Sequence, residues 1–113
     1  MNIQIFGTKK SADTRKAERF FKERGIRFQA VDMNEKGLSK GELTSVIQAV
    51  GGLDELIDPD CKDKELLALV RYIAEEDRLQ KVLENQSVLK QPIVRNGRQA
   101  TAGYQPEVWK TWE

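Results

Sequence analysis

The fold of this chain is decided near its N-terminus by the stretch Ile3-Gln4-Ile5-Phe6-Gly7-Thr8-Lys9-Lys10-Ser11-Ala12-Asp13-Thr14-Arg15-Lys16-Ala17. Apolar residues alternate in its first part, which predicts a strand over residues 2–6. The spacing of Ala17, Phe20 and Phe21 predicts the buried face of a helix over residues 12–24. A strand, a basic loop and a helix N-terminus therefore follow one another directly.

The start of this helix is a candidate anion site. Exposed backbone N–H groups and the positive end of a helix favour negative charge and lower the pKa of a thiol placed there. Thiol–disulfide enzymes put their nucleophilic cysteine at such a helix start, but this chain has Ser11. Lys9, Lys10 and Arg15 add positive charge around the loop. The competing interpretation is that these three form an ordinary solvated basic face.

Ser11 itself has two interpretations. As the N-cap residue, its hydroxyl accepts a hydrogen bond from a backbone N–H of the first helical turn. As a nucleophile it needs a base, and the chain has no histidine. Lys9 or Lys10 would need strong desolvation to act as that base, which neighbouring like charges on a surface loop do not provide. The sequence therefore excludes a serine hydrolase.

Composition and charge narrow the class of protein. The 113 residues, 39% of them hydrophobic, predict one globular domain. The net charge of +1 gives no argument for nucleic acid or for a membrane surface. We expect a cytoplasmic protein, because no apolar run reaches the length of a membrane span. With no histidine and one cysteine, we predict no metal site and no bound cofactor.

The single cysteine, Cys61, rules out an internal disulfide and fits a reducing compartment. Asp58, Asp60 and Asp63 are its neighbours in sequence, and their negative charge disfavours a thiolate. A helix that starts just after it has the opposite effect. We therefore expect Cys61 to be a surface or half-buried structural thiol, with a redox role as the alternative.

The rest of the chain alternates between β and α patterns. A second strand is expected over residues 26–31, parallel to the first through the crossover helix. Ser39 and Glu42 form a capping-box pattern that begins a helix, and Asp63 is a plausible N-cap of the next one. The apolar face predicted for that next helix consists of Leu66, Leu69, Val70 and Ile73. A further short helix is expected around Leu79, Val82 and Leu83.

The C-terminal part returns to β structure. Ile93 and Val94 begin a hairpin, and Asn96-Gly97 suits a type I′ turn at its tip. A short helix over residues 107–112 finishes the chain, with Trp109 and Trp112 expected in the core. The order is β-α-β, a helical insert, then β-β-α, as in thioredoxin-like proteins. The predicted fold is α/β, with a mixed four-stranded sheet flanked by helices.

Several separated segments together resemble the arsenate reductase (ArsC) and Spx group of the thioredoxin-like superfamily. These segments are Thr14-Arg15-Lys16-Ala17, Gln91-Pro92-Ile93-Val94 with the following Asn96-Gly97, and Gly103-Tyr104-Gln105-Pro106-Glu107. The resemblance covers essentially the whole chain. It implies a single domain over residues 1–113, with a core of 1–37 and 91–113 and a helical insert at 38–90. It also implies a cis peptide bond before Pro92.

The departures from this family pattern are equally informative. Arsenate-reducing members have an arginine before the proline, where this chain has Gln91, and two further family arginines fall near Tyr104 and Asp58. Planar guanidinium groups bind tetrahedral oxyanions through paired bonds that these residues cannot make. Spx-like members have a second cysteine where this chain has Thr14. The resemblance is therefore to a monothiol, glutaredoxin-like branch that lacks the arsenate-binding arginines.

The resemblance implies a thiol–disulfide oxidoreductase whose nucleophile position is Ser11, so we expect this chain to be inactive as written. On this reading Lys9, Lys10 and Arg15 favour an anion, Thr14 supplies a hydroxyl, and Gln91 and Pro92 shape the groove for a thiol or disulfide substrate. Glutathione or another thiol would be the co-substrate, and the protein would be a monomer. The alternative is a non-enzymatic, Spx-like regulator that binds RNA polymerase. Both a native and an engineered serine are compatible with the sequence.

Overall fold

One mixed sheet organises the computed structural model, which describes residues 1–112. The four strands in this part of the chain are β1 (Ile3–Gly7), β2 (Phe28–Asp32), β3 (Ile93–Asn96) and β4 (Gln99–Ala102), arranged in the order β2-β1-β3-β4. β1 runs parallel to β2 and antiparallel to β3, and β3 and β4 form a hairpin. The parallel pair is joined by α1 (Ala12–Glu23), as the β-α-β pattern predicts.

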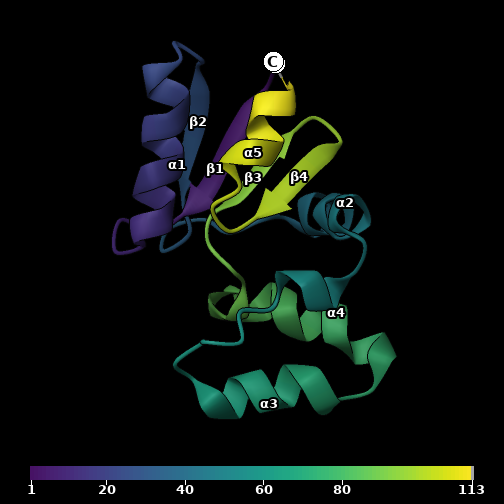
Figure 1. Ribbon diagram of the computed structural model, residues 1–113. Helices are drawn as coiled ribbons and strands as arrows, with labels where there is room; N and C mark the ends of the chain where they lie inside the picture. The colour runs from purple at the N-terminus through teal and green to yellow at the C-terminus, as the bar shows by residue number, and fades with distance from the viewer. Residues whose placement is uncertain (113) are drawn as a thin grey trace.

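Helices cover both faces of this sheet. The remaining helical segments are α2 (Lys40–Val50), η1 (Leu53–Leu56), α3 (Lys64–Tyr72), α4 (Glu75–Glu84), η2 (Gln86–Val88), α5 (Pro106–Trp109) and η3 (Lys110–Trp112). Figure 1 shows α2 beside β4, and α3 and α4 beyond the end of the sheet where β1 leads into α1. The predicted α/β architecture, a mixed four-stranded sheet flanked by helices with a helical insert, is confirmed.

Side chains alternate between the two faces of the sheet, so the core consists of two clusters, one on each face. Ile3, Ile5 and Val94 meet α1 and α5 on one face, where Trp109 is fully buried. The indole N–H of Trp109 donates a hydrogen bond of 2.7 Å to Thr101 Oγ1. The other face, with Phe6, packs against α2 and the insert. The prediction that Trp109 belongs to the core is therefore confirmed.

Two local predictions were wrong, one on the position of the hairpin turn and one on the buried face of α3. The hairpin turn consists of Gly97 and Arg98, because Asn96 still pairs with Gln99. Among these residues only Gly97 has a positive φ, of 61°, which is the pattern of a type II′ turn rather than type I′. In α3, Leu69 is 42% exposed although it was expected on the apolar face. Val70 is buried as predicted, and Leu67 is buried in place of Leu69.

A buried arginine fixes the insert. Arg78 of α4 donates from Nε to the carbonyl oxygen of Val70 at 2.8 Å and also pairs with Asp54 and Glu75. The hydrogen bond to Asp54 is the main reason that the pKa of Arg78 is raised, against the opposing effect of burial. Since both carboxylates are largely exposed, their ion pairs stabilise little. The bond to Val70 is therefore the contact that ties α4 to α3.

We predict that Arg78→Met destabilises the protein by about 1–3 kcal/mol, because the carbonyl of Val70 loses its buried partner. Urea denaturation measures the free energy of unfolding. The matched control is Arg71→Met, at an exposed arginine of α3, with an expected change within about 0.5 kcal/mol. Equal losses in the two variants would contradict this role for Arg78.

Candidate functional site

Ser11 is the N-cap of α1, at the end of the loop that follows β1. Its backbone is extended, with φ −77° and ψ 115°, and its Oγ accepts a hydrogen bond of 3.1 Å from the backbone N–H of Thr14. The predicted capping role is therefore confirmed. The Oγ also lies at the positive end of the helix dipole, where negative charge on this atom would be stabilised.

The loop is held tightly because Thr14 packs on Gly7 of β1. A Cβ atom built on Gly7 would lie 2.3 Å from Thr14 Oγ1, far inside van der Waals contact. Thr14 is only 5% exposed, and its Oγ1 has no hydrogen-bond partner among residues 1–112. The absence of a side chain at Gly7 thus lets the first turn of α1 approach the end of β1.

Gln91 holds the same loop from the other side. Its Oε1 accepts hydrogen bonds from the backbone N–H of Thr8 at 3.0 Å and from Thr8 Oγ1 at 2.9 Å. The Gln91–Pro92 peptide bond is cis, as the family resemblance implied. Pro92 is buried, and its carbonyl accepts from the N–H of Gly103 at 2.9 Å. The side-chain amide oxygen of Gln91 is thus engaged within the protein, at a position where the resemblance placed a binding residue.

A groove of about 760 Å³ separates this loop from the insert. Lys10, Ser11 and Gln91 line it from the sheet side, and the loop over residues 58–63 lines it from the insert. Cys61 belongs to this second wall and is only 7% exposed, so the expectation of a surface or half-buried thiol was wrong. Its burial follows from packing of this loop into the core shared by the insert and the sheet.

Three of the predicted site residues lie elsewhere. Lys9, Thr14 and Arg15 line a separate hollow of about 570 Å³. Asp32, the last residue of β2, and Glu35 in the following turn line it as well. The guanidinium group of Arg15 donates to the backbone carbonyl of Lys9. The basic cluster expected around the helix start is therefore divided, and only Lys10 reaches the groove beside Ser11.

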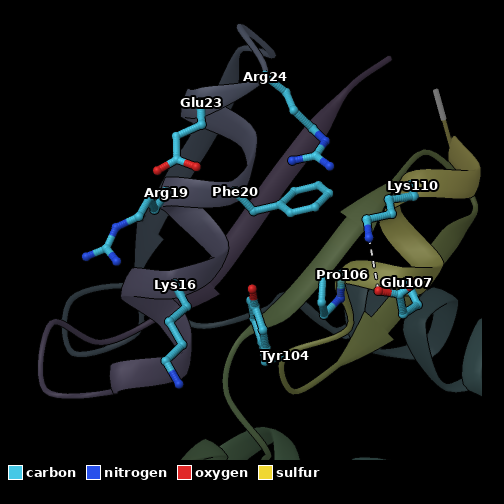
Figure 2. A pocket seen from close by; sticks show the side chains of 9 residues that line it. All are labelled: Lys16, Arg19, Phe20, Glu23, Arg24, Tyr104, Pro106, Glu107 and Lys110. Carbon is cyan, nitrogen blue, oxygen red and sulfur yellow. Dashed lines mark hydrogen bonds and ion pairs between the residues drawn. The ribbon is translucent and has the colours of Figure 1, made fainter.

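A third hollow, of about 370 Å³, lies between α1 and the C-terminal helix (Figure 2). Figure 2 shows the ammonium group of Lys110 directed at Glu107, at an N···O distance of 3.0 Å. The guanidinium carbon of Arg24 lies 3.9 Å from the centre of the Phe20 ring. Lys110 and Arg24 are thus engaged with neighbouring side chains. Ser11 does not line this hollow.

Sequence reasoning missed the acidic wall of the groove. The aspartates of this wall were interpreted from the sequence as neighbours of Cys61, with Asp58 also at the place of a missing family arginine and Asp63 as a helix cap. The structure places Asp58, Asp60 and Asp63 together across the groove from the loop at Ser11. The position of Asp63 at the start of α3 is local and was predicted, since its side chain accepts from the N–H of Leu66 at 3.1 Å. The approach of this loop to Ser11 is a long-range contact that no local pattern indicates.

Comparisons with known proteins agree with this architecture. The sequence model of the ArsC family matches residues 6–112. The chain belongs to the ArsC family. It is also 30% identical over 106 residues to the global transcriptional regulator Spx 2 of Oceanobacillus iheyensis, covering 92% of this chain and 78% of that protein.

Solved ArsC-type structures share the fold at lower sequence identity. An ArsC family related protein from Bacteroides fragilis superposes with a TM-score of 0.85 at 19% identity, covering 100% of this chain and 98% of that one. Arsenate reductase from Vibrio cholerae gives a TM-score of 0.80 at 22% identity, with 96% and 94% covered. Among the residues that the structure describes, no helix has the length and apolar character of a membrane span.

We predict that Gly7→Ala destabilises this ArsC family protein by about 1–3 kcal/mol, because the new methyl group overlaps the side chain of Thr14. In the double variant Gly7→Ala/Thr14→Ala the overlap is largely removed. The loss should therefore be smaller than the sum of the two single losses, as measured by urea denaturation.

The control for this experiment is Gly41→Ala in α2, where an added Cβ meets nothing within 4 Å. Removing glycine from an exposed helix position should stabilise the protein by about 0.5–1 kcal/mol. Strict additivity of the changes at Gly7 and Thr14 would contradict the contact.

Proposed function

We propose that this chain has the thiol-exchange site of a monothiol, glutaredoxin-like ArsC protein, with Ser11 at the position of the nucleophilic sulfur. With serine at this position, the chain does not reduce disulfides. The site would accept a thiol or disulfide substrate and use glutathione or another thiol as co-substrate, without a bound cofactor. We further propose that it works as a cytoplasmic monomer.

The observation that carries the proposal is the contact of the Ser11 Oγ with the N-terminus of α1. The Oγ accepts a hydrogen bond from the Thr14 N–H and lies at a groove next to the cis peptide of Gln91–Pro92. A thiolate here would gain from the helix dipole and from this N–H. Lys10 adds an exposed positive charge on the same groove.

A hydroxyl at this position cannot replace the thiolate. Its proton is held far more tightly than that of a thiol, and the chain contains no histidine to remove it. Thiol–disulfide exchange also needs a sulfur that can form a mixed disulfide. Ser11 therefore keeps the helix cap, without the redox chemistry of the site.

We expect Ser11→Cys to create activity. In a Cys61→Ser background, the new thiol should titrate below its ordinary pKa of about 8.5 and reduce hydroxyethyl disulfide with glutathione as the reductant. Thiolate absorbance against pH gives the pKa, and consumption of glutathione gives the turnover.

The matched control is Ser39→Cys in the same background. Ser39 is also an N-cap serine, and its Oγ accepts from the N–H of Glu42 at 3.1 Å, but it lies at α2, away from the groove. The two variants separate the effect of a helix N-terminus from that of the whole site. No turnover for Ser11→Cys above that of Ser39→Cys would refute the proposed function.

A second candidate function is that of a non-enzymatic regulator that binds RNA polymerase. It is favoured by the 30% identity to Spx 2, which is named as a global transcriptional regulator. It is also compatible with the exposed apolar side chains of α3, where Tyr72 is 85% and Leu69 is 42% exposed. This function would need no sulfur at Ser11.

For this alternative we expect the chain with its native Ser11 to bind purified bacterial RNA polymerase in a surface-immobilised binding assay. Tyr72→Ser should weaken binding if the insert supplies the contact, because a large apolar side chain is lost from the interface. The matched control is Tyr104→Ser, at an exposed tyrosine outside the insert. Absence of binding at micromolar concentrations would remove this alternative.

A further inference from the structure

The groove beside Ser11 is acidic on balance. Carboxylates line it at Asp13, Asp58, Asp60 and Asp63, whereas its cations are Lys10 and Lys62. Lys9 and Arg15, which would have offset this charge, face the separate hollow near β2. The groove therefore has two more negative than positive side chains, although the whole chain carries a net charge of +1.

The carboxylates on the insert side are held by the backbone rather than by cations. Asp58 accepts from the N–H of Asp60 at 2.9 Å, and Asp63 accepts from that of Leu66 at 3.1 Å. Within residues 1–112, no lysine or arginine forms an ion pair with Asp58, Asp60 or Asp63. Their charge is thus uncompensated by ion pairs and acts on whatever enters the groove.

The acidic wall and the start of α1 have opposite preferences. The N-terminus of α1 favours negative charge at one atom, the Oγ of Ser11. The facing wall disfavours a partner that carries negative charge over its whole length. Charges of one sign on the walls of a cleft concentrate the field inside it and select the partner's charge.

We propose, on the basis of the function proposed above, that the disulfide-bearing partner of this groove is a basic protein segment. Asp13 belongs to α1, whereas Asp58 and Asp60 belong to the loop across the groove. Among residues 1–112, no group of three or more carboxylates or thiols could hold a metal ion. An extended segment with several lysines or arginines, by contrast, can place separate cations against the two walls. A cavity of about 760 Å³ is of the size that holds a short stretch of side chains.

The covalent step can occur only after a sulfur is introduced at position 11. In Ser11→Cys, the thiolate attacks one sulfur of the partner's disulfide, a new S–S bond forms and the old one breaks. The second sulfur leaves as a thiolate and takes a proton from solvent. A thiol reductant then attacks the introduced sulfur, forms a mixed disulfide with it and releases the partner as a thiol. A second reductant thiol attacks that mixed disulfide, leaves as a disulfide with the first reductant and regenerates the thiolate at position 11. With native Ser11 the interaction is non-covalent binding alone.

The first experiment uses the native chain and measures non-covalent binding. Fluorescence anisotropy compares a labelled lysine-rich peptide with a glutamate-rich peptide of the same length. We expect the basic peptide to bind at least about tenfold more tightly at low ionic strength, with the preference falling as salt is added. Equal affinities for the two peptides overturn the proposal.

Substitutions locate that binding to the groove. Asp58→Asn/Asp60→Asn removes two carboxylates from the acidic wall and should weaken binding of the basic peptide, whereas Lys62→Gln should strengthen it. The matched control is Asp77→Asn, at an exposed aspartate in α4 outside the groove. If the control weakens binding as much as the groove variant, the peptide binds elsewhere and the proposal is wrong.

The second experiment separates this inference from the proposed function. The variant Ser11→Cys/Cys61→Ser is mixed with each of three disulfides of similar size, which carry amines, hydroxyls or carboxylates, and the three reaction rates are compared. The inference predicts that the reaction rate is highest for the cationic disulfide, intermediate for the neutral one and lowest for the anionic one. At low salt the first and last rates should differ about tenfold. Fast reaction without that order overturns the inference and leaves the proposed function standing. Slow reaction with all three refutes the proposed function, and the peptide titration then decides the inference alone.

Discussion

The arrangement of the site depends on the close approach of α1 to the end of β1. Thr14 fills the space that a side chain at Gly7 would need, so the first helical turn begins directly beside the strand. This contact places the Oγ of Ser11 at the start of the helix. Gln91, which lies just before β3, binds Thr8 in the same loop. These contacts thus determine where Ser11 lies relative to the groove.

The second wall of the groove depends on the insert, which is held by different forces. Leu67, Val70 and Val82 bury the apolar sides of α3 and α4, and Arg78 joins these helices through the carbonyl of Val70. The loop before α3 is thereby brought to the sheet end, and Cys61 is buried with it. The chemistry of the groove therefore comes from two parts of the chain that fold around separate contacts.

Much of the fold could be predicted from local signals in the sequence, because these signals have local physical causes. Ser39 begins α2 through a capping box, and Asp63 caps α3, both as expected. The turn after Asn96 was misplaced by one residue, since strand pairing rather than the Asn-Gly dipeptide sets its register. The acidic wall was not predicted at all, because it depends on how the insert docks. Periodicity gives the buried face of a helix only approximately, as the exposed Leu69 illustrates.

Oxygen in place of the proposed sulfur at position 11 is compatible with this fold for a physical reason. A helix N-terminus that stabilises a thiolate is also a good place for a capping hydroxyl, because both use the same N–H of Thr14. On the proposed function, serine lacks the nucleophilic sulfur, while the helix start keeps its hydrogen bond. The facing carboxylates are unaffected by that exchange. The proposed recognition of a partner by charge and the proposed reaction with its sulfur are therefore separable, because three of the four carboxylates of the groove lie across it from Ser11.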